Sequence, residues 1–165
     1  MITSNIQLGE EVNIDPTTSI NNVKIGNHVR IAKYCSIFGA ANLLLEIGDN
    51  SYIGMFSIVN GYAAKVIIGK NVSIAQGVNI MADSGPNAST LMQQYYPLIK
   101  GPVKIGDHSW LGANSIIMPG VELGEFCVVA ANSFVDKSFP PYSVVGGNPA
   151  KLIKSILDDN NKKIF

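Results

Sequence analysis

Aliphatic residues recur every six positions along most of the chain, each with a small or compact residue two places before it. A helix would space apolar residues three and four apart and a half-buried strand would alternate them, so a period of six fits neither alone. The period is typical of a solenoid, in which three short strands form a triangular coil of about eighteen residues and successive coils stack. The aliphatic positions in this phase are Ile25, Ile31, Ile37, Ile47, Ile53, Val59, Ile68, Ile74, Ile80, Ile105, Leu111, Ile117, Leu123, Val129 and Val135.

One segment interrupts this rhythm between Ser84 and Pro102, and the pattern resumes at Val103. A loop of this length inside a compact domain is usually functional or disordered. It is too apolar for a solvated tail, since it contains Leu91, Met92, Tyr95, Tyr96, Leu98 and Ile99. We expect the inserted loop 84–102 to lie across its own coil or on a neighbouring subunit, where it either only strengthens an oligomer or also walls a site.

A different signal follows the last repeat, at Asn148 and Pro149. Asn is a good N-cap and Pro is favoured at the first helical position, so a helix is expected to begin here. Its apolar face would consist of Leu152, Ile153, Ile156 and Leu157. The predicted organisation is a β-helix domain over residues 1–148 and a short C-terminal α-helix with its tail over residues 149–165, in which residues 158–163 should fray.

Composition removes several classes of function from consideration. The twelve basic and twelve acidic side chains cancel, so no electrostatic argument favours nucleic acid or an anionic membrane as a partner. No apolar run approaches the roughly 20 residues needed to cross a bilayer. The first residues lack a basic region followed by an apolar block, and the expected location is the cytoplasm.

The only two cysteines, Cys35 and Cys127, both fall two places before an aliphatic position. That slot points inward and is filled by serine in other coils. Two distant inward thiols are most simply small core residues, because a reactive cysteine needs exposure and a lowered pKa. We therefore expect neither to be a nucleophile.

Two further segments carry a family resemblance: Ile105–Ala113 and Pro140–Lys151, which contain Trp-Leu-Gly-Ala and Asn-Pro-Ala-Lys. Over roughly residues 5 to 157 the chain resembles the hexapeptide-repeat acyltransferases with a left-handed parallel β-helix. It is most similar to the sugar O-acetyltransferases of bacterial surface-polysaccharide and lipopolysaccharide synthesis. The resemblance implies a homotrimer with active sites in clefts between neighbouring solenoids, where acetyl-CoA lies along the late coils as co-substrate.

The resemblance also implies roles for particular residues. Those that match positions lining the coenzyme groove are Trp110, Ala113, Ala131, Pro149 and Lys151, with Lys151 near the phosphates. Many relatives carry a general-base histidine in the loop matching residues 83–87, but no histidine stands there in this chain. Carbonic-anhydrase relatives with the same fold bind zinc through three histidines, and because this chain has two we expect no metal.

Acetyl transfer from a thioester to a hydroxyl needs a base for the hydroxyl proton and donors for the developing oxyanion. His108 stands three places after an aliphatic position, which puts it on the outer surface, two residues before Trp110. We expect His108 to be the base or a proton-relay partner, although Asn50 and Asn71 hold the equivalent place in earlier coils. His28 lies several coils earlier and is expected to be an ordinary surface residue.

Asp83 is the competing base, because it follows Ile80 by three places at the corner where the loop departs. A carboxylate there could accept the proton if its pKa were raised, or could orient His108. The candidate acceptor-binding residues are Asn79, Ser84 and Asn87.

The sequence therefore predicts an acetyl-CoA-dependent enzyme that acetylates a hydroxyl of a small-molecule or lipid-linked sugar by direct attack in a ternary complex. The sugar acceptor is implied by the resemblance alone. Two alternatives stay open: transfer to the amine of an amino sugar or a small xenobiotic, and a non-catalytic β-helix scaffold that kept the fold and lost the base.

Overall fold

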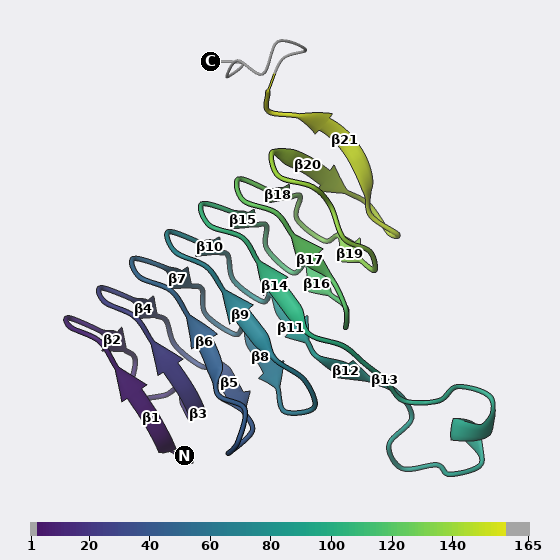
Figure 1. Ribbon diagram of the computed structural model, residues 1–165, viewed down its shortest axis with the longest axis horizontal. Coiled ribbons are helices and arrows are strands. Elements are labelled where there is room, and N and C mark those ends of the chain that lie inside the picture. Colours follow the sequence, from purple (N-terminus) through teal and green to yellow (C-terminus); the bar gives the residue numbers. More distant parts are fainter. Residues whose placement is uncertain (1–2, 158–165) are drawn as a thin grey trace.

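Short parallel strands stacked into three flat faces make up nearly all of the computed structural model, which describes residues 3–157 (Figure 1). The six-residue period fixes this shape, because every third strand returns to the same face one coil later. Strand β1 (Thr3–Leu8) opens the solenoid and pairs in parallel with β3 (Ser19–Ile25). Because β3 runs through a corner, its two halves pair with strands on two different faces.

We name the three faces by what they expose. The charged face consists of the second half of β3, β6 (Leu45–Ile47), β9 (Val66–Ile68), β14 (Val103–Ile105) and β17 (Glu122–Leu123). The tryptophan face consists of β2 (Asn13–Ile14), β4 (Arg30–Ile31), β7 (Tyr52–Ile53), β10 (Ser73–Ile74), β15 (Trp110–Leu111), β18 (Val128–Val129) and β20 (Ser143–Gly146). The apolar face consists of the first half of β3, β5 (Ser36–Gly39), β8 (Ile58–Gly61), β11 (Asn79–Met81), β16 (Ile116–Ile117) and β19 (Phe134–Val135).

The outward residues of two faces differ mainly in charge. The charged face exposes or half-exposes Lys24, Glu46, Lys104 and Glu122, with Ile67 at the equivalent position of β9. The apolar face presents Ile58, Ile116 and Phe134 in one outward column, which also contains Ser36 and Asn79. A second outward column contains Phe38, Asn60 and Met81. A sheet face that exposes this much apolar surface is typical of a protein–protein interface.

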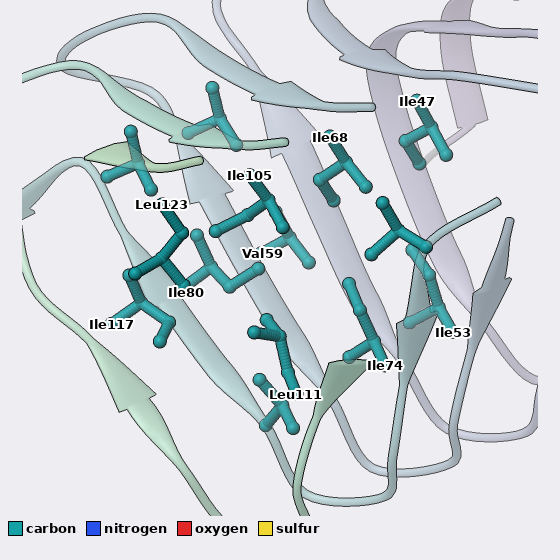
Figure 2. Close-up of a cluster of buried hydrophobic side chains, with 14 of the residues drawn as sticks. Ile47, Ile53, Val59, Ile68, Ile74, Ile80, Ile105, Leu111, Ile117 and Leu123 are labelled. Carbon is teal, nitrogen blue, oxygen red and sulfur yellow. The ribbon is translucent and has the colours of Figure 1, made fainter. Parts of the chain in front are cut away.

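The core is a set of aliphatic columns in the phase that the sequence predicts. Figure 2 shows these side chains stacked across successive coils, with Ile53, Ile74 and Leu111 on one wall and Val59, Ile80 and Ile117 on another. All six are at most 1% exposed. The two cysteines occupy the inward slot as expected, and burial raises the pKa of both thiols. They therefore act as small core residues.

Three corners join the faces. The histidine corner leads from the charged to the tryptophan face and carries His28 and His108, and the alanine corner leads from the tryptophan to the apolar face and carries Ala113 and Ala131. The arm corner leads from the apolar face back to the charged face. From it the inserted loop projects away from the stacked coils (Figure 1). We call residues 83–100 the arm.

The arm stands on a two-stranded stalk. Strand β12 (Asp83–Ser84) pairs antiparallel with β13 (Ile99–Lys100), and the segment between them contains one 3-10 turn, η1 (Met92–Gln94). No residue from Gly85 to Ile99 is buried. The arm does not fold back across its own coil, which was one of the two expected placements.

The predicted C-terminal α-helix over residues 149–157 is wrong. After a cis Asn148–Pro149 peptide, the chain forms strand β21 (Lys151–Ser155), which pairs antiparallel with β20. The open edge of the last coil explains this, because the backbone groups of β20 need partners and an adjoining strand supplies them. The C-terminal segment is thus a cap on the solenoid, and the predicted fraying at 158–163 lies outside the described residues.

Candidate active site

The alanine corner is bare in the late coils. Ala113 and Ala131 hold matching positions one coil apart, since Asn132 N–H donates to the carbonyl of Ala113 over 2.8 Å and β15 pairs in register with β18. The same position carries a long side chain in the earlier coils: Lys33, Met55 and Gln76. Small side chains leave the corner backbone open to a long, thin ligand.

The other predicted coenzyme residues lie next to this corner. Trp110 is 56% exposed on the tryptophan face, beside Val128. In the last coil Ala150 N–H donates to the carbonyl of Phe134 over 2.7 Å, which places Pro149 in line with the alanine corner. Lys151 is exposed at the start of β21. The structure thus gathers all five predicted coenzyme residues at the late end of the solenoid.

The arm corner gathers Asp83, Ser84 and Asn87 but not Asn79. Asp83 is half-buried at the root of the arm, where Asn60 Nδ2 donates to its Oδ1 over 2.7 Å. Asn79 instead begins β11 beside the alanine corner, where its Nδ2 donates to the carbonyl of Gly77 over 3.3 Å. Ser84 is half-buried in the stalk, and Asn87 is exposed within the arm. These groups could bind an acceptor and take a proton from it.

His108 lies at a different corner from Asp83, with β14 between them. Its ring is exposed and stacks on Phe126, with ring centroids 4.7 Å apart and an interplanar angle of 11°, and Phe126 stacks in turn on Tyr142. Among residues 3–157 no side chain hydrogen-bonds to the His108 ring. One chain therefore does not bring His108 and Asp83 together. His28 pairs with Glu11 over 3.0 Å, as suits a surface residue.

Two neighbours of these candidates were not identified from the sequence. Phe126 follows His108 by eighteen residues, which is one coil, so the repeat alone could have found this stack. Asn60 precedes Asp83 by 23 residues because the corner between β8 and β9 is longer. No regular period could have found that contact.

A shallow groove of about 620 Å³ lies on the charged face and contains none of the predicted site residues. Its rim carries Lys104, which pairs with Glu122 over 2.9 Å, together with Asp107 and Glu125. Because three carboxylates and only one ammonium group line the rim, the groove would repel the phosphates of a coenzyme. Within residues 3–157 no cluster of His, Cys, Asp and Glu could hold a metal ion, and no helix could span a membrane.

Comparison with known proteins gives a consistent set of relatives. Residues 102–137 match the family model described as the hexapeptide repeat of succinyl-transferase. The chain is 32% identical to the dTDP-4-amino-4,6-dideoxy-D-glucose acyltransferase of Escherichia coli, over 96% of this chain and 84% of that enzyme. It is 34% identical to the galactoside O-acetyltransferase of Escherichia coli strain K12, over 73% of this chain and 59% of that enzyme.

The structural similarity extends over most of the solenoid. AntD, an N-acyltransferase from Bacillus cereus crystallised with dTDP and 3-hydroxybutyryl-CoA, matches with a TM-score of 0.77 and 28% identity, over 89% of this chain and 81% of that one. Three other acetyltransferases match over 62%, 75% and 49% of their own lengths. The chain therefore spans about half to three quarters of those relatives.

Proposed function

The chain belongs to the hexapeptide-repeat acyltransferase family, and on that premise we propose that it transfers an acetyl group from acetyl-CoA to the amine of a nucleotide-linked amino sugar. The observation that carries this proposal is the half-buried carboxylate of Asp83 at the root of the arm, in the loop where many relatives have a general-base histidine. Two of the relatives that match over most of the chain act, by their names, on an amino-sugar nucleotide and as an N-acyltransferase. A chloramphenicol acetyltransferase matches over 91% of the chain as well.

An amine acceptor places a weaker demand on the base than a hydroxyl does. The neutral amine nitrogen attacks the thioester carbonyl directly, and its proton is lost only after attack, when the nitrogen is positively charged and acidic. The C–S bond then breaks, the amide forms and the thiolate of CoA leaves and takes up a proton. A carboxylate such as Asp83, held by Asn60, can orient the amine and accept its proton without being a strong base.

The late alanine corner fits the thioester substrate. Ala113 and Ala131 leave the backbone accessible to a pantetheine arm, and Lys151 offers an exposed ammonium group for phosphate at the end of the solenoid. CoA supplies the activated acyl group when bound, and the chain orients it along this corner. That AntD has been crystallised with an acyl-CoA supports an acyl-CoA as the substrate.

The site is proposed to be completed by a second protomer. The alanine corner and the arm corner bound opposite edges of the apolar face, so one chain does not bring Ala113 and Ala131 together with Asp83. If the apolar faces of three protomers surround a threefold axis, the alanine corner of each meets the arm corner of the next. A homotrimer would then bury the apolar face and assemble three complete sites.

Transfer to a sugar hydroxyl is the second candidate, favoured by the similarity to galactoside O-acetyltransferase and by the exposed imidazole of His108. A hydroxyl acceptor needs a stronger base than a carboxylate, and a histidine can supply one at neutral pH. In that case the proton would be taken at the histidine corner.

The decisive experiment measures thiol release from acetyl-CoA with matched acceptors. The panel pairs each nucleotide-linked amino sugar with the same sugar carrying a hydroxyl in place of the amine, and adds galactosides. We expect release with the amine and an amide product by mass spectrometry. Preferential reaction of the hydroxyl sugars would assign the second candidate, and no release with any member would leave the non-catalytic scaffold.

A further inference from the structure

Two aromatic residues occupy an unfavourable backbone conformation at the alanine corner of the early coils. Tyr34 and Phe56 have φ angles of 58° and 62°, and a left-handed conformation costs an L-residue with a bulky side chain about 1–2 kcal/mol. Later coils place residues that tolerate this conformation at the same position: Gly77, Asn114 and Asn132. The early coils therefore keep two strained residues where less costly ones would serve.

Burial within the chain does not offset this cost. The rings of Tyr34 and Phe56 stack on each other, with centroids 5.3 Å apart, but the two residues remain 56% and 58% exposed. Met55 and Ile58 lie beside them and are also exposed. We call these four residues the aromatic patch. An exposed apolar cluster rimmed by polar residues marks an interaction site.

The arm carries a second exposed apolar surface. Leu91 and Tyr95 are 71% and 78% exposed, and Met92 and Tyr96 are exposed as well. The segment of the arm between β12 and β13 contains no charged residue and no buried residue. This surface has no partner within the described part of its own chain, and it matches the aromatic patch in chemistry.

The two surfaces also match in position. The aromatic patch lies at the alanine corner and the arm leaves the arm corner, so they bound the same face on opposite edges. The arm leaves after β11, which pairs directly with β8, the strand that follows Phe56. Neighbouring strands are about 4.8 Å apart, so the arm root lies within one or two coils of the patch along the axis.

We propose that the arm of each protomer docks on the aromatic patch of the next protomer in the ring. The contact is heterologous, and three copies close it into a cycle. The proposal rests on the trimer described above and names the surface that receives the arm. Docked there, the arm lies at the boundary between the bulky early half of the alanine corner and its bare late half, and becomes the wall of the coenzyme groove on that side.

A pair of matched asparagine variants separates this interface from an effect on folding. Phe56→Asn gives the early coil the residue that later coils use, so it relieves backbone strain and leaves the solenoid intact. We expect the dissociation constant of the trimer to rise at least about tenfold, with unchanged far-ultraviolet circular dichroism. The control is Phe126→Asn at the histidine corner, which has a φ of 56° and should leave assembly unchanged.

Disulfide trapping tests the contact itself. Phe56→Cys is combined in turn with Leu91→Cys, Tyr95→Cys and Tyr96→Cys, and the protein is treated with a mild oxidant. Cys35 and Cys127 are buried with raised thiol pKa values, so their background reaction is slow. We expect covalent dimers and trimers for at least one pair, and none when Phe126→Cys replaces Phe56→Cys.

Three outcomes would overturn the proposal. Disulfides formed only within one chain would place the arm on its own solenoid. A trimer that yields no disulfide for any pair would place it elsewhere on the partner, and a monomer at working concentration would leave the patch for a different protein. Thiol release from acetyl-CoA is measured on the unmodified protein in parallel, so a failed interface and a failed enzyme are told apart.

Discussion

The two halves of the alanine corner share a backbone and differ in what they expose. Each coil repeats the same hydrogen bond to the coil before it, at 2.9 to 3.0 Å in three successive coils. The early half displays long or aromatic side chains and the late half displays alanine and asparagine. The early residues are Lys33, Tyr34, Met55, Phe56 and Gln76, and the late ones are Ala113, Asn114, Ala131 and Asn132.

This difference shows how a repeat protein assigns tasks along one edge. The inward positions are fixed by stacking, so the coils cannot differ there without loss of the fold. Outward positions at the corner are free of that constraint. Bulky side chains then suit contact with protein, and small ones suit contact between a ligand and the backbone. The comparison predicts that substitutions at core positions destabilise the early and late coils alike. Substitutions at the alanine corner should have different effects in its early half and its late half.

The largest effect is expected at the arm corner, which would face the late half of the alanine corner across the protomer boundary. Asp83→Asn keeps the shape and the contact with Asn60 but removes the proton acceptor, so turnover should fall by roughly 10²–10⁴-fold with the trimer intact. Steady-state thiol release measures it. His28→Ala is the control and should change little. If His108→Ala costs more than Asp83→Asn, the proton is taken at the histidine corner instead.

Core truncation should act equally on both halves. Ile74 and Leu111 are 1% and 0% exposed and stack in adjacent coils, so Ile74→Ala and Leu111→Ala should each lower the free energy of unfolding by roughly 2–5 kcal/mol. Arg30→Ala, on the outer surface, should stay within about 0.5 kcal/mol. Chemical denaturation measures all three. Equal shifts for Arg30→Ala and the core variants would refute the six-residue phase.

Enlarging the late half of the alanine corner should weaken coenzyme binding. Ala131→Met gives it the side chain that the early half carries at Met55, and we expect KM for acetyl-CoA to rise about tenfold, or ~1.4 kcal/mol, with kcat nearly unchanged. The matched control is Glu125→Met, an exposed position at the histidine corner in the same coil. If the two variants raise KM equally, the coenzyme does not lie along the alanine corner.

The smallest effect concerns the pH dependence of the early coils. The side chain of Lys70 hydrogen-bonds Asp49 and, with the backbone N–H of Asn27, holds the pKa of that carboxyl below its ordinary value. A carboxyl whose pKa is lower in the folded state stabilises the fold at neutral pH and loses that contribution as pH falls through the folded pKa.

When the pH falls from about 6 to about 3, the Tm of Asp49→Asn should therefore decrease less than the Tm of the unchanged protein. The difference is expected to be small because Lys70 is well exposed and solvent screens the pair. Glu10→Gln, on the same corner, serves as the control. An identical loss of Tm in Asp49→Asn and the unchanged protein would mean that this contact does not contribute.

The core and the faces could be predicted from the sequence because stacking leaves a strict period at residues such as Ile74 and Leu111. The placement of His108, Asp83 and Ala131 at three different corners also follows from counting within the coil. What they do together does not follow, because residues on separate corners meet only through an assembly that no local pattern encodes. Their roles stay predictions.

The C-terminal end shows the limit of local signals. The Asn148–Pro149 pair is a sound helix start by propensity, but the open edge of β20 competes for the same residues and prevails. Such a competition depends on where the last coil ends in space. Asn60 escaped notice for a similar reason, because an irregular corner sets its distance from Asp83.

The arm also separates the folding of the early coils from the folding of the late coils. Contacts between neighbouring coils usually join residues about eighteen apart, as Ser109 and Cys127 do, but across the arm Lys70 and Asp107 are 37 residues apart. Doubling the length of a closed loop costs only about 0.6 kcal/mol, so the insertion is tolerated at equilibrium. Folding that spreads from coil to coil must, however, close a longer loop at the arm than elsewhere. We therefore expect the coils before the arm to form one cooperative unit, on which the later coils then fold one at a time.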